Sequence, residues 1–352
     1  SDGEPPGDAP SATLDDTIGI SSDGSLVVFA SEATNLTQNK NRGLLLRDLE
    51  ARTTVSLDAL PSEVEMSSDG SSIAYIIGQQ ILHQHQVGGR WVTAALTAAS
   101  TFPDRLAISG DGERVLFVTE DNLIAADQDV LQDVYLWEPS METVTLVSDR
   151  FDTAQTVDAH AHNPALSADG NWIAFSSEAN LAGDSALPNA VIWLRYLDSE
   201  DWEIVGVAGE DARAPALSQS GRYLSFQAGT ETRVADMANN VVTTRTLGNT
   251  AVTGPLSASG RFLMVRSTGS EYPLEEATLP PQTDASLQAW RFNWRANSAM
   301  PASLSGIQYA DADVTASTLS ANGRYCAWAS TTSGFGSLLN GRRQVFHTDL
   351  WE

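Results

Sequence analysis

A five-residue pattern occurs seven times along the chain: an apolar residue, serine, any residue, Asp, Ser or Asn, and then glycine. The glycines of the seven copies are Gly24, Gly70, Gly112, Gly170, Gly221, Gly260 and Gly323. They are spaced roughly 40 to 60 residues apart, which is the length of a four-stranded propeller blade with variable loops. The spacing therefore predicts seven repeated sheets rather than two unrelated domains.

Each copy of the pattern predicts a tight hairpin between two strands. Asp, Asn or Ser can accept a hydrogen bond from its own backbone, and glycine tolerates a positive φ where the chain reverses. The residues five positions after the glycines are Phe29, Tyr75, Phe117, Phe175, Phe226, Val265 and Trp328, of which six are aromatic. They lie in alternating strands such as Trp172–Ser177, so we expect them to pack between neighbouring sheets.

The sequence contains no convincing run of helical period, so the expected class is all-β. The expected fold is a seven-bladed β-propeller with four antiparallel strands per blade, formed by residues 11–352 as one domain. The seventh repeat ends with its third strand, Gln344–Trp351. We expect the N-terminal segment Ser11–Leu14 to supply the missing strand, because this addition would leave no open sheet edge.

Residues 20–36 and 166–181 are the copies of the repeat that most clearly carry the resemblance described next. The pattern resembles the WD40-like β-propeller repeat of the TolB type, and the resemblance spans about residues 11–352. This family occurs in bacterial envelope proteins. The repeat is also similar to that of the propeller domains of prolyl-oligopeptidase-type enzymes and to that of oligogalacturonate lyases, so the fold does not select one function.

Composition narrows the set of partners. The formal net charge is −25 and Lys40 is the single lysine, so nucleic acid and anionic membrane surfaces are not expected partners. No apolar run approaches the roughly 18 residues that span a bilayer. Residues 1–10 form an acidic Pro/Gly segment that we interpret as a flexible linker left after removal of a targeting segment. We expect a monomer that is periplasmic, anchored to the outer membrane or extracellular.

Motifs for covalent catalysis are absent from the sequence. It has no G-x-S-x-G, H-E-x-x-H, C-x-x-C or P-loop pattern. The one cysteine, Cys326, excludes an internal disulfide and falls within an expected strand, where a buried and inert thiol is expected. We therefore predict no catalytic residues.

Polar residues recur where the chain enters the innermost strand of each blade. Counting back from the repeated serine places them at the mouth of the central channel, on the face that also carries the loops between second and third strands. The candidate ligand-binding residues are Asp16, Glu63, Asp104, Arg105, His160, His162, Asn163 and Arg213. Their mixed charge suits a polar ligand or a cation, although solvated polar groups also line such openings without any ligand.

A loop in the third repeat carries Asp127, Asp129 and Asp133. These are hard oxygen ligands with D-x-D spacing, which suits Ca²⁺, although the loop lacks the glycine and the final glutamate of an EF-hand. Asx turns, in which each carboxylate accepts a bond from its own backbone, explain the same pattern without metal. A second pair, His83 and His85, lies on one face of a strand; H-x-H can chelate a metal, but we interpret it as a polar outer strand face.

Two functions fit these observations. The first is a non-catalytic exported propeller that binds an envelope or extracellular protein, or a saccharide-like polar ligand, on its loop face. The alternative is a metal-assisted polysaccharide (uronate) lyase with its site at the channel mouth, in which His162, Arg213 and Arg105 would bind metal and carboxylate. No cofactor is required for the first function, and Ca²⁺ is the candidate ion.

Overall fold

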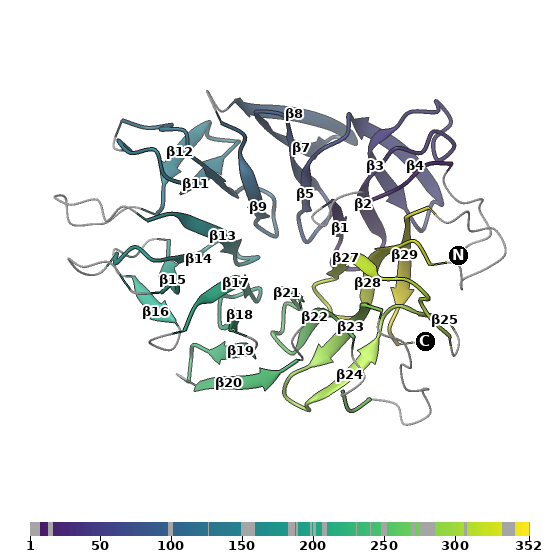
Figure 1. Cartoon of the computed structure of the whole chain (residues 1–352). Coiled ribbons are helices and arrows are strands. Elements are labelled where there is room, and N and C mark those ends of the chain that lie inside the picture. Colours follow the sequence, from purple (N-terminus) through teal and green to yellow (C-terminus); the bar gives the residue numbers. More distant parts are fainter. Residues whose placement is uncertain are drawn as a thin grey trace. The chain divides into compact units, whose positions relative to one another are not determined.

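The computed structural model confirms the predicted class: it is a seven-bladed β-propeller built from antiparallel sheets (Figure 1). It describes residues 8–12, 17–97, 101–125, 127–148, 159–181, 187, 189–197, 199, 202–205, 210–229, 231–239, 241–247, 252–268, 272–274, 286–305, 308–332 and 342–351. Among these residues there is no α-helix, and hence no helix that could cross a membrane.

The chain divides into two compact units, Ser1–Met66 with Arg245–Glu352, and Ser67–Thr244. The strands of the first unit are β1 (Ile18–Ile20), β2 (Leu26–Ser31), β3 (Gly43–Asp48), β4 (Thr53–Asp58), β5 (Glu63–Met66), β21 (Val252–Leu256), β22 (Phe262–Ser267), β23 (Gln288–Asn293), β24 (Ser298–Pro301), β25 (Leu304–Ser305), β26 (Gln308–Tyr309), β27 (Val314–Leu319), β28 (Tyr325–Ser330) and β29 (Gln344–Asp349).

The strands of the second unit are β6 (Ser72–Ile77), β7 (Gln80–Val87), β8 (Arg90–Thr97), β9 (Asp104–Ile108), β10 (Val115–Thr119), β11 (Asp133–Glu138), β12 (Thr143–Leu146), β13 (Ala161–Leu166), β14 (Trp172–Ser177), β15 (Val191–Tyr196), β16 (Glu203–Val205), β17 (Ala212–Leu217), β18 (Tyr223–Ala228), β19 (Glu231–Asp236) and β20 (Val241–Thr246). Within each blade the sheet order follows the chain order, so every blade is an up-and-down meander.

The seven residues expected to pack between sheets are all buried. Phe175 on β14 shows how they do so. It belongs to one apolar cluster with Leu116 and Val134 of blade 3 and with Trp193 of its own blade. The column of aromatic residues therefore forms the core between neighbouring sheets, as the repeat predicts.

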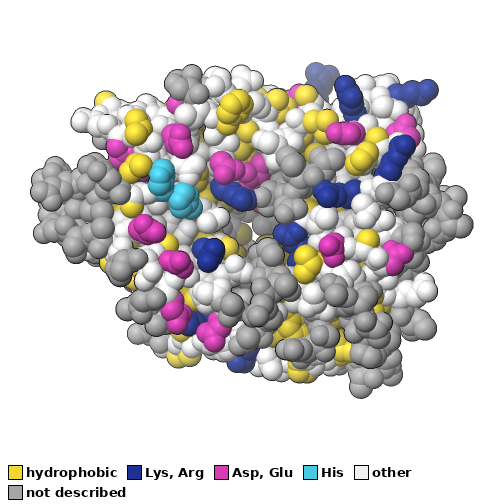
Figure 2. Space-filling model, in the orientation of Figure 1, with side chains coloured by type: hydrophobic (Ala, Val, Ile, Leu, Met, Phe, Trp, Pro, Cys, Tyr) yellow, Lys and Arg dark blue, Asp and Glu magenta, His cyan; other side chains and the backbone are white. Residues whose placement is uncertain are grey.

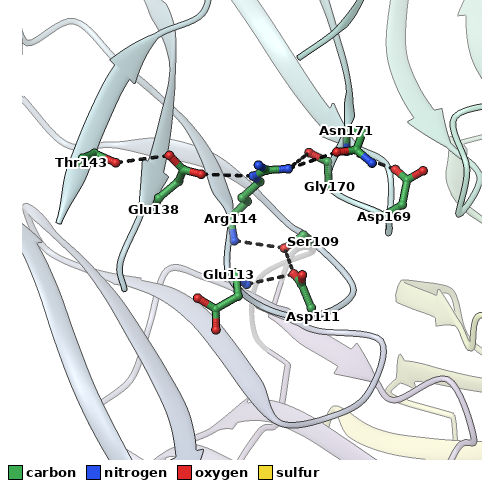
Figure 3. Close-up of polar contacts among 9 residues, drawn as sticks. All are labelled: Ser109, Asp111, Glu113, Arg114, Glu138, Thr143, Asp169, Gly170 and Asn171. Atoms are coloured by element: carbon green, nitrogen blue, oxygen red, sulfur yellow. Dashed lines mark hydrogen bonds and ion pairs between the residues drawn. The ribbon is translucent and has the colours of Figure 1, made fainter. Parts of the chain in front are cut away.

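The repeated turn is held by its own side chains, as Figure 3 shows for blade 3. Ser109 Oγ donates to Asp111 Oδ1 at 2.6 Å and accepts a bond from the Arg114 amide at 3.0 Å. The Asp111 carboxylate also accepts a bond from the Glu113 amide at 3.1 Å. In this turn serine and aspartate together satisfy the backbone groups of the reversal.

Neighbouring turns are also linked to one another. Gly110 N–H donates to Ala168 O of blade 4 at 2.8 Å, and Arg114 Nη1 donates to Gly170 O at 2.9 Å (Figure 3). A side chain from one blade covers the turn glycine of the next, as Trp172 covers Gly221. The turn is therefore part of the contact between blades as well as of its own hairpin.

The N-terminal segment links the first and last blades, as its predicted role in closing the last blade requires. The seventh sheet has three strands among the described residues, β27, β28 and β29. Ser11 forms an isolated bridge with Ser31 of blade 1, and its amide donates to Arg343 O, just before β29, at 2.9 Å. Arg343 Nη1 in turn donates to Ala12 O at 2.9 Å. Residues 13 and 14 of the predicted closing strand lie outside the described residues.

Candidate functional site

The innermost strands of blades 3, 4 and 5 each contain a β-bulge at the same place. The register shifts between β9 and β10, between β13 and β14, and between β17 and β18. At each bulge one non-glycine residue has a left-handed backbone, with φ of 53° at Arg105, 50° at Asn163 and 51° at Ala214. Such bulges turn a strand and re-aim its side chains. The register also shifts between β21 and β22 and between β27 and β28 of the first unit, so the bulge recurs along the repeat.

Each bulge stands opposite the buried aromatic residue of the next strand. In blade 4 the pairing runs from His162 with Ser176 to Ala165 with Ala174, so two residues face Phe175 alone. The second of these two is Pro164, which lacks an amide hydrogen and is tolerated where the ladder is interrupted. The core aromatic and the bulge are thus one local arrangement, and the residues before the bulge emerge on the surface.

The register predicted from the sequence brings several candidate residues to neighbouring strands of the second unit. Strand β13 contacts both β9 and β17. Asp104, Arg105, His162 and Arg213 are exposed at corresponding positions of these strands, and Asn163 is half-buried. Arg105 Nε lies 4.0 Å from Asp104 Oδ2, which is a weak and solvated ion pair. Figure 2 shows two adjacent histidines among acidic and basic side chains on this face.

His160 and His162 form a stacked pair, with ring centroids 5.5 Å apart and planes 18° from parallel. Gln132 N–H donates to His160 Nδ1 at 3.0 Å. In the neutral ring the proton must therefore reside on Nε2, which becomes a hydrogen-bond donor. A ring in this state offers a ligand a donor rather than a free lone pair for a metal.

The pKa of His162 lies below its usual value. Burial of part of the ring is the largest cause, followed by the neighbouring His160, whereas Glu178 and Asp104 act in the opposite direction. The electrostatic influence of Asp104 on β9 upon His162 on β13 is a sign that the two residues are close. Near neutral pH the His162 ring is therefore uncharged.

Two other candidates are not placed with this group. Asp16 lies outside the described residues. Glu63, on β5 of the first unit, is buried with 6 % of its surface exposed. A buried carboxylate with further contacts of its own is not an exposed ligand group.

Two exposed apolar residues near these polar candidates in the sequence were not identified by counting back from the repeated serine. Phe102 is 71 % exposed and precedes Asp104 by two residues, and Val130 is 80 % exposed in the loop that carries Gln132. Both lie in loops, so neither contributes to the alternating pattern that identifies strands. The sequence feature that could have identified them is an apolar residue next to Pro103 and to Asp129, in loop segments that are mostly polar.

The three aspartates of the blade 3 loop do converge. One carboxylate oxygen of each of Asp127, Asp129 and Asp133 lies within 4.8 Å of the others. Hydrogen bonds within the protein already use these groups: Asp127 accepts from the Asp129 amide and from Tyr135, and Asp129 accepts from the Leu131 amide at 2.9 Å. Asp133 accepts from Ser148 Oγ at 2.6 Å. Two of these contacts are Asx turns, which accounts for the cluster without an ion.

Comparison with known proteins supports the fold at a general level. No family model matches the sequence, and no curated protein sequence matches it. Among solved structures, 1089 chains are similar. One is described as "Crystal Structure of Mitotic Checkpoint Complex", with a TM-score of 0.55 and 12 % identity over 93 % of this chain and 86 % of that chain. The chain therefore has a WD40-like seven-bladed propeller fold, and the likeness shows the fold alone.

Proposed function

We propose that this chain is a non-catalytic binding protein that recognises a protein partner with the exposed surface of blades 3 to 5. We call this surface the loop-face patch; it comprises Phe102, Asp104, Arg105, Val130, His160, His162 and Arg213. The observation that carries the proposal is the placement of two strongly exposed apolar side chains beside a set of fixed polar groups. Apolar anchors within a polar rim are characteristic of protein interfaces.

The polar part of the patch favours ligand groups that accept hydrogen bonds. Arg105 and Arg213 are exposed guanidinium groups, and His160 presents an Nε2–H donor because its Nδ1 is occupied. These donors stand out in a chain with 45 acidic and 20 basic residues. We infer a partner that presents carboxylates or backbone carbonyls next to an apolar side chain.

A saccharide ligand or a uronate lyase activity is the competing function. The two arginines beside the histidine pair favour it, since they could hold a uronate carboxylate. A lyase of this kind also needs a metal on an imidazole lone pair. The Gln132 amide occupies the Nδ1 lone pair of His160, which leaves His162 as the histidine of this pair for such a metal.

We further propose that the protein is exported, as expected for the TolB-type repeat that its sequence resembles. The composition supports this proposal: acidic residues dominate, lysine is rare, and the only cysteine is buried and reduced. Labelling of intact source cells with a membrane-impermeant reagent, before and after opening of the outer membrane, tests it. Protection of the protein until the cytoplasm is opened would reject export.

The binding function can be tested without knowing the natural partner. A phage-displayed peptide library is selected on the immobilised protein, and an array of neutral and uronate oligosaccharides is tested in parallel. We expect selected peptides that combine an acidic group with an apolar side chain, and at least tenfold weaker binding of these peptides by the variant Phe102→Ala/His162→Ala/Arg213→Ala.

The matched control is Arg90→Ala/Met141→Ala, which removes an exposed arginine and an exposed apolar side chain elsewhere in the same unit. This control should bind the selected peptides like the unaltered protein. Equal losses in both variants would reject the loop-face patch as the binding surface. Cleavage of uronate oligosaccharides to unsaturated products would instead establish the lyase.

A further inference from the structure

The second histidine pair of the chain is not on an outer polar face, as its sequence pattern was interpreted. His83 and His85 lie on β7 of blade 2, and only 3 % of the surface of His83 is exposed to solvent. Its ring contacts the edge of Trp137 in blade 3, with centroids 6.2 Å apart. The pair is therefore enclosed between the sheets of blades 2 and 3.

The pair contains three buried nitrogens that lack hydrogen bonds. Both ring nitrogens of His83 and Nδ1 of His85 have no hydrogen-bond partner among the described residues. The Gly112 carbonyl is near enough to His83 to favour its charged form, without completing a hydrogen bond of normal geometry. Buried polar groups are almost always hydrogen-bonded, so these unpartnered nitrogens are the groups of this region that a ligand could satisfy.

An unprotonated ring nitrogen without a hydrogen-bond partner suits a metal ion as its ligand. A neutral imidazole has a free lone pair, which is the form that binds metal ions. This pair thus differs from His160, whose Nδ1 accepts a hydrogen bond from Gln132.

The local geometry also allows chelation. The two rings are stacked, with centroids 5.5 Å apart and planes 23° from parallel. Metal–imidazole bonds are about 2.0–2.1 Å long, so two nitrogens that share an ion are at most about 4.2 Å apart. Chelation therefore requires the rings to rotate from this stacked arrangement. The strand neighbours of His83 are Ala74 and Ala94, whose side chains are small.

We propose that His83 and His85 form a binding site for a late divalent transition-metal ion, with two imidazole ligands and water in the remaining positions. His85 is half-buried and gives the ion its path to solvent. Borderline ions prefer imidazole, and affinity rises toward copper, so Cu²⁺ should bind more tightly than Zn²⁺ or Ni²⁺. The site is separate from the loop-face patch and does not depend on the function proposed for it.

Titration with CuCl₂, followed by electron paramagnetic resonance and equilibrium dialysis, tests the site. We expect one Cu²⁺ per chain with nitrogen hyperfine structure in the variant His160→Ala/His162→Ala, which lacks the other pair. Adding His85→Ala to that variant should weaken binding at least tenfold. His83→Ala should do the same, and if it fails to fold, the half-buried His85 still decides the question.

A thermal readout separates the proposed site from surface binding. Because an ion that binds the folded protein stabilises it by mass action, ZnCl₂ should raise the melting temperature of the unaltered protein and of His160→Ala/His162→Ala. It should have no such effect on His85→Ala. Unchanged copper stoichiometry in His85→Ala, or the loss of all binding in His160→Ala/His162→Ala, would overturn the proposal and assign the orphaned nitrogens to internal water.

Discussion

Phe175 fills the space between two blades without any exposed surface. We expect Phe175→Ala to lower the free energy of unfolding by about 3–5 kcal/mol, because it removes apolar contacts and leaves a cavity against Trp193 and Trp202. Urea denaturation measures this change. Phe102→Ala, which removes the same side chain from the surface, should stay within about 0.5 kcal/mol. Similar losses for the two variants would contradict the assignment of Phe175 to the core.

Asp69 in the turn of blade 2 links stability to pH. Burial opposes ionisation of this carboxyl, but hydrogen bonds from Ser67 and Ser71 outweigh it and place the pKa below the model-peptide value of 3.8. A group with a depressed folded-state pKa stabilises the protein above its unfolded pKa, and this contribution is lost as pH falls through the folded value.

The urea midpoint should therefore decrease as the pH is lowered below about 4. Asp69→Asn should show a shallower decrease over the same range, since an amide does not titrate. A variant whose pH profile runs parallel to that of the unaltered protein would show that the carboxylate does not contribute.

The side chains of the turn explain why the blades could be predicted from the sequence. The hydrogen bonds of Ser109 and Asp111 join residues within five positions of one another, so the pattern is local and visible in the chain. Counting five residues back from the repeated serine correctly selected corresponding positions, Asp104, His162 and Arg213, because the bulges of these three blades have the same length. The burial of His83 was not predictable, because it depends on Trp137 and the turn at Gly112 in another blade.

At the scale of the strand, the bulge is the feature that could not be predicted from the sequence. A left-handed backbone usually indicates glycine, whereas the bulge positions hold Arg105, Asn163 and Ala214. Asn takes a left-handed backbone more readily than most residues, but Arg and Ala do not, so the residue types at these positions do not identify the bulge. The contact of the N-terminal segment with blade 1 was also not predicted: Ser11 bonds to Ser31 through its side chain at 2.7 Å, and alternation does not reveal such a contact.

The turn at Gly221 tests how one blade supports the next. Its φ is +70°, and an added Cβ would lie 2.2 Å from the Trp172 ring of blade 4. Gly229 has a similar φ of +62° but open space around it. We expect Gly229→Ala to cost about 1–2 kcal/mol for the left-handed backbone alone.

Gly221→Ala should cost about 1–3 kcal/mol more than Gly229→Ala, because Trp172 must move. Chemical denaturation of the two variants measures the difference. Equal costs would mean that the Trp172 ring shifts freely and does not hold the neighbouring turn.

At the scale of the whole molecule, the N-terminal segment should contribute to stability by joining blades 1 and 7. Deletion of residues 1–15 removes two backbone hydrogen bonds, from Ser11 N–H to Arg343 O and from Ala12 N–H to Ala30 O, and the bond that the Arg343 side chain donates to Ala12 O. Buried hydrogen bonds contribute on the order of 1 kcal/mol each, so a loss of about 3 kcal/mol or more is expected by calorimetry. Deletion of residues 1–7 leaves these contacts intact and is the control. If both truncated proteins melt at the same temperature, the segment does not tie the two blades.

The net charge of −25 makes stability depend on salt. Like charges repel more strongly in the compact state, and raising NaCl from about 0.01 M to about 1 M shortens the screening length from about 30 Å to about 3 Å. The melting temperature should therefore rise by several degrees at neutral pH. Near the sequence pI of about 4.3 the net charge vanishes and so should most of the salt effect. An equal effect at both pH values would show that screening is not the cause.

The bulges of β9, β13 and β17 have a consequence for how such a chain can diversify. The residue that faces the core, such as Phe175, and the residue that emerges on the surface, such as His162, lie on different strands and are joined only through backbone pairing. Under the proposed binding function, a mutation at the surface position would alter recognition while leaving the interior untouched. Duplicated genes on this scaffold could acquire new specificities through single substitutions at Asp104, His162 or Arg213, without first acquiring a compensating change in the core.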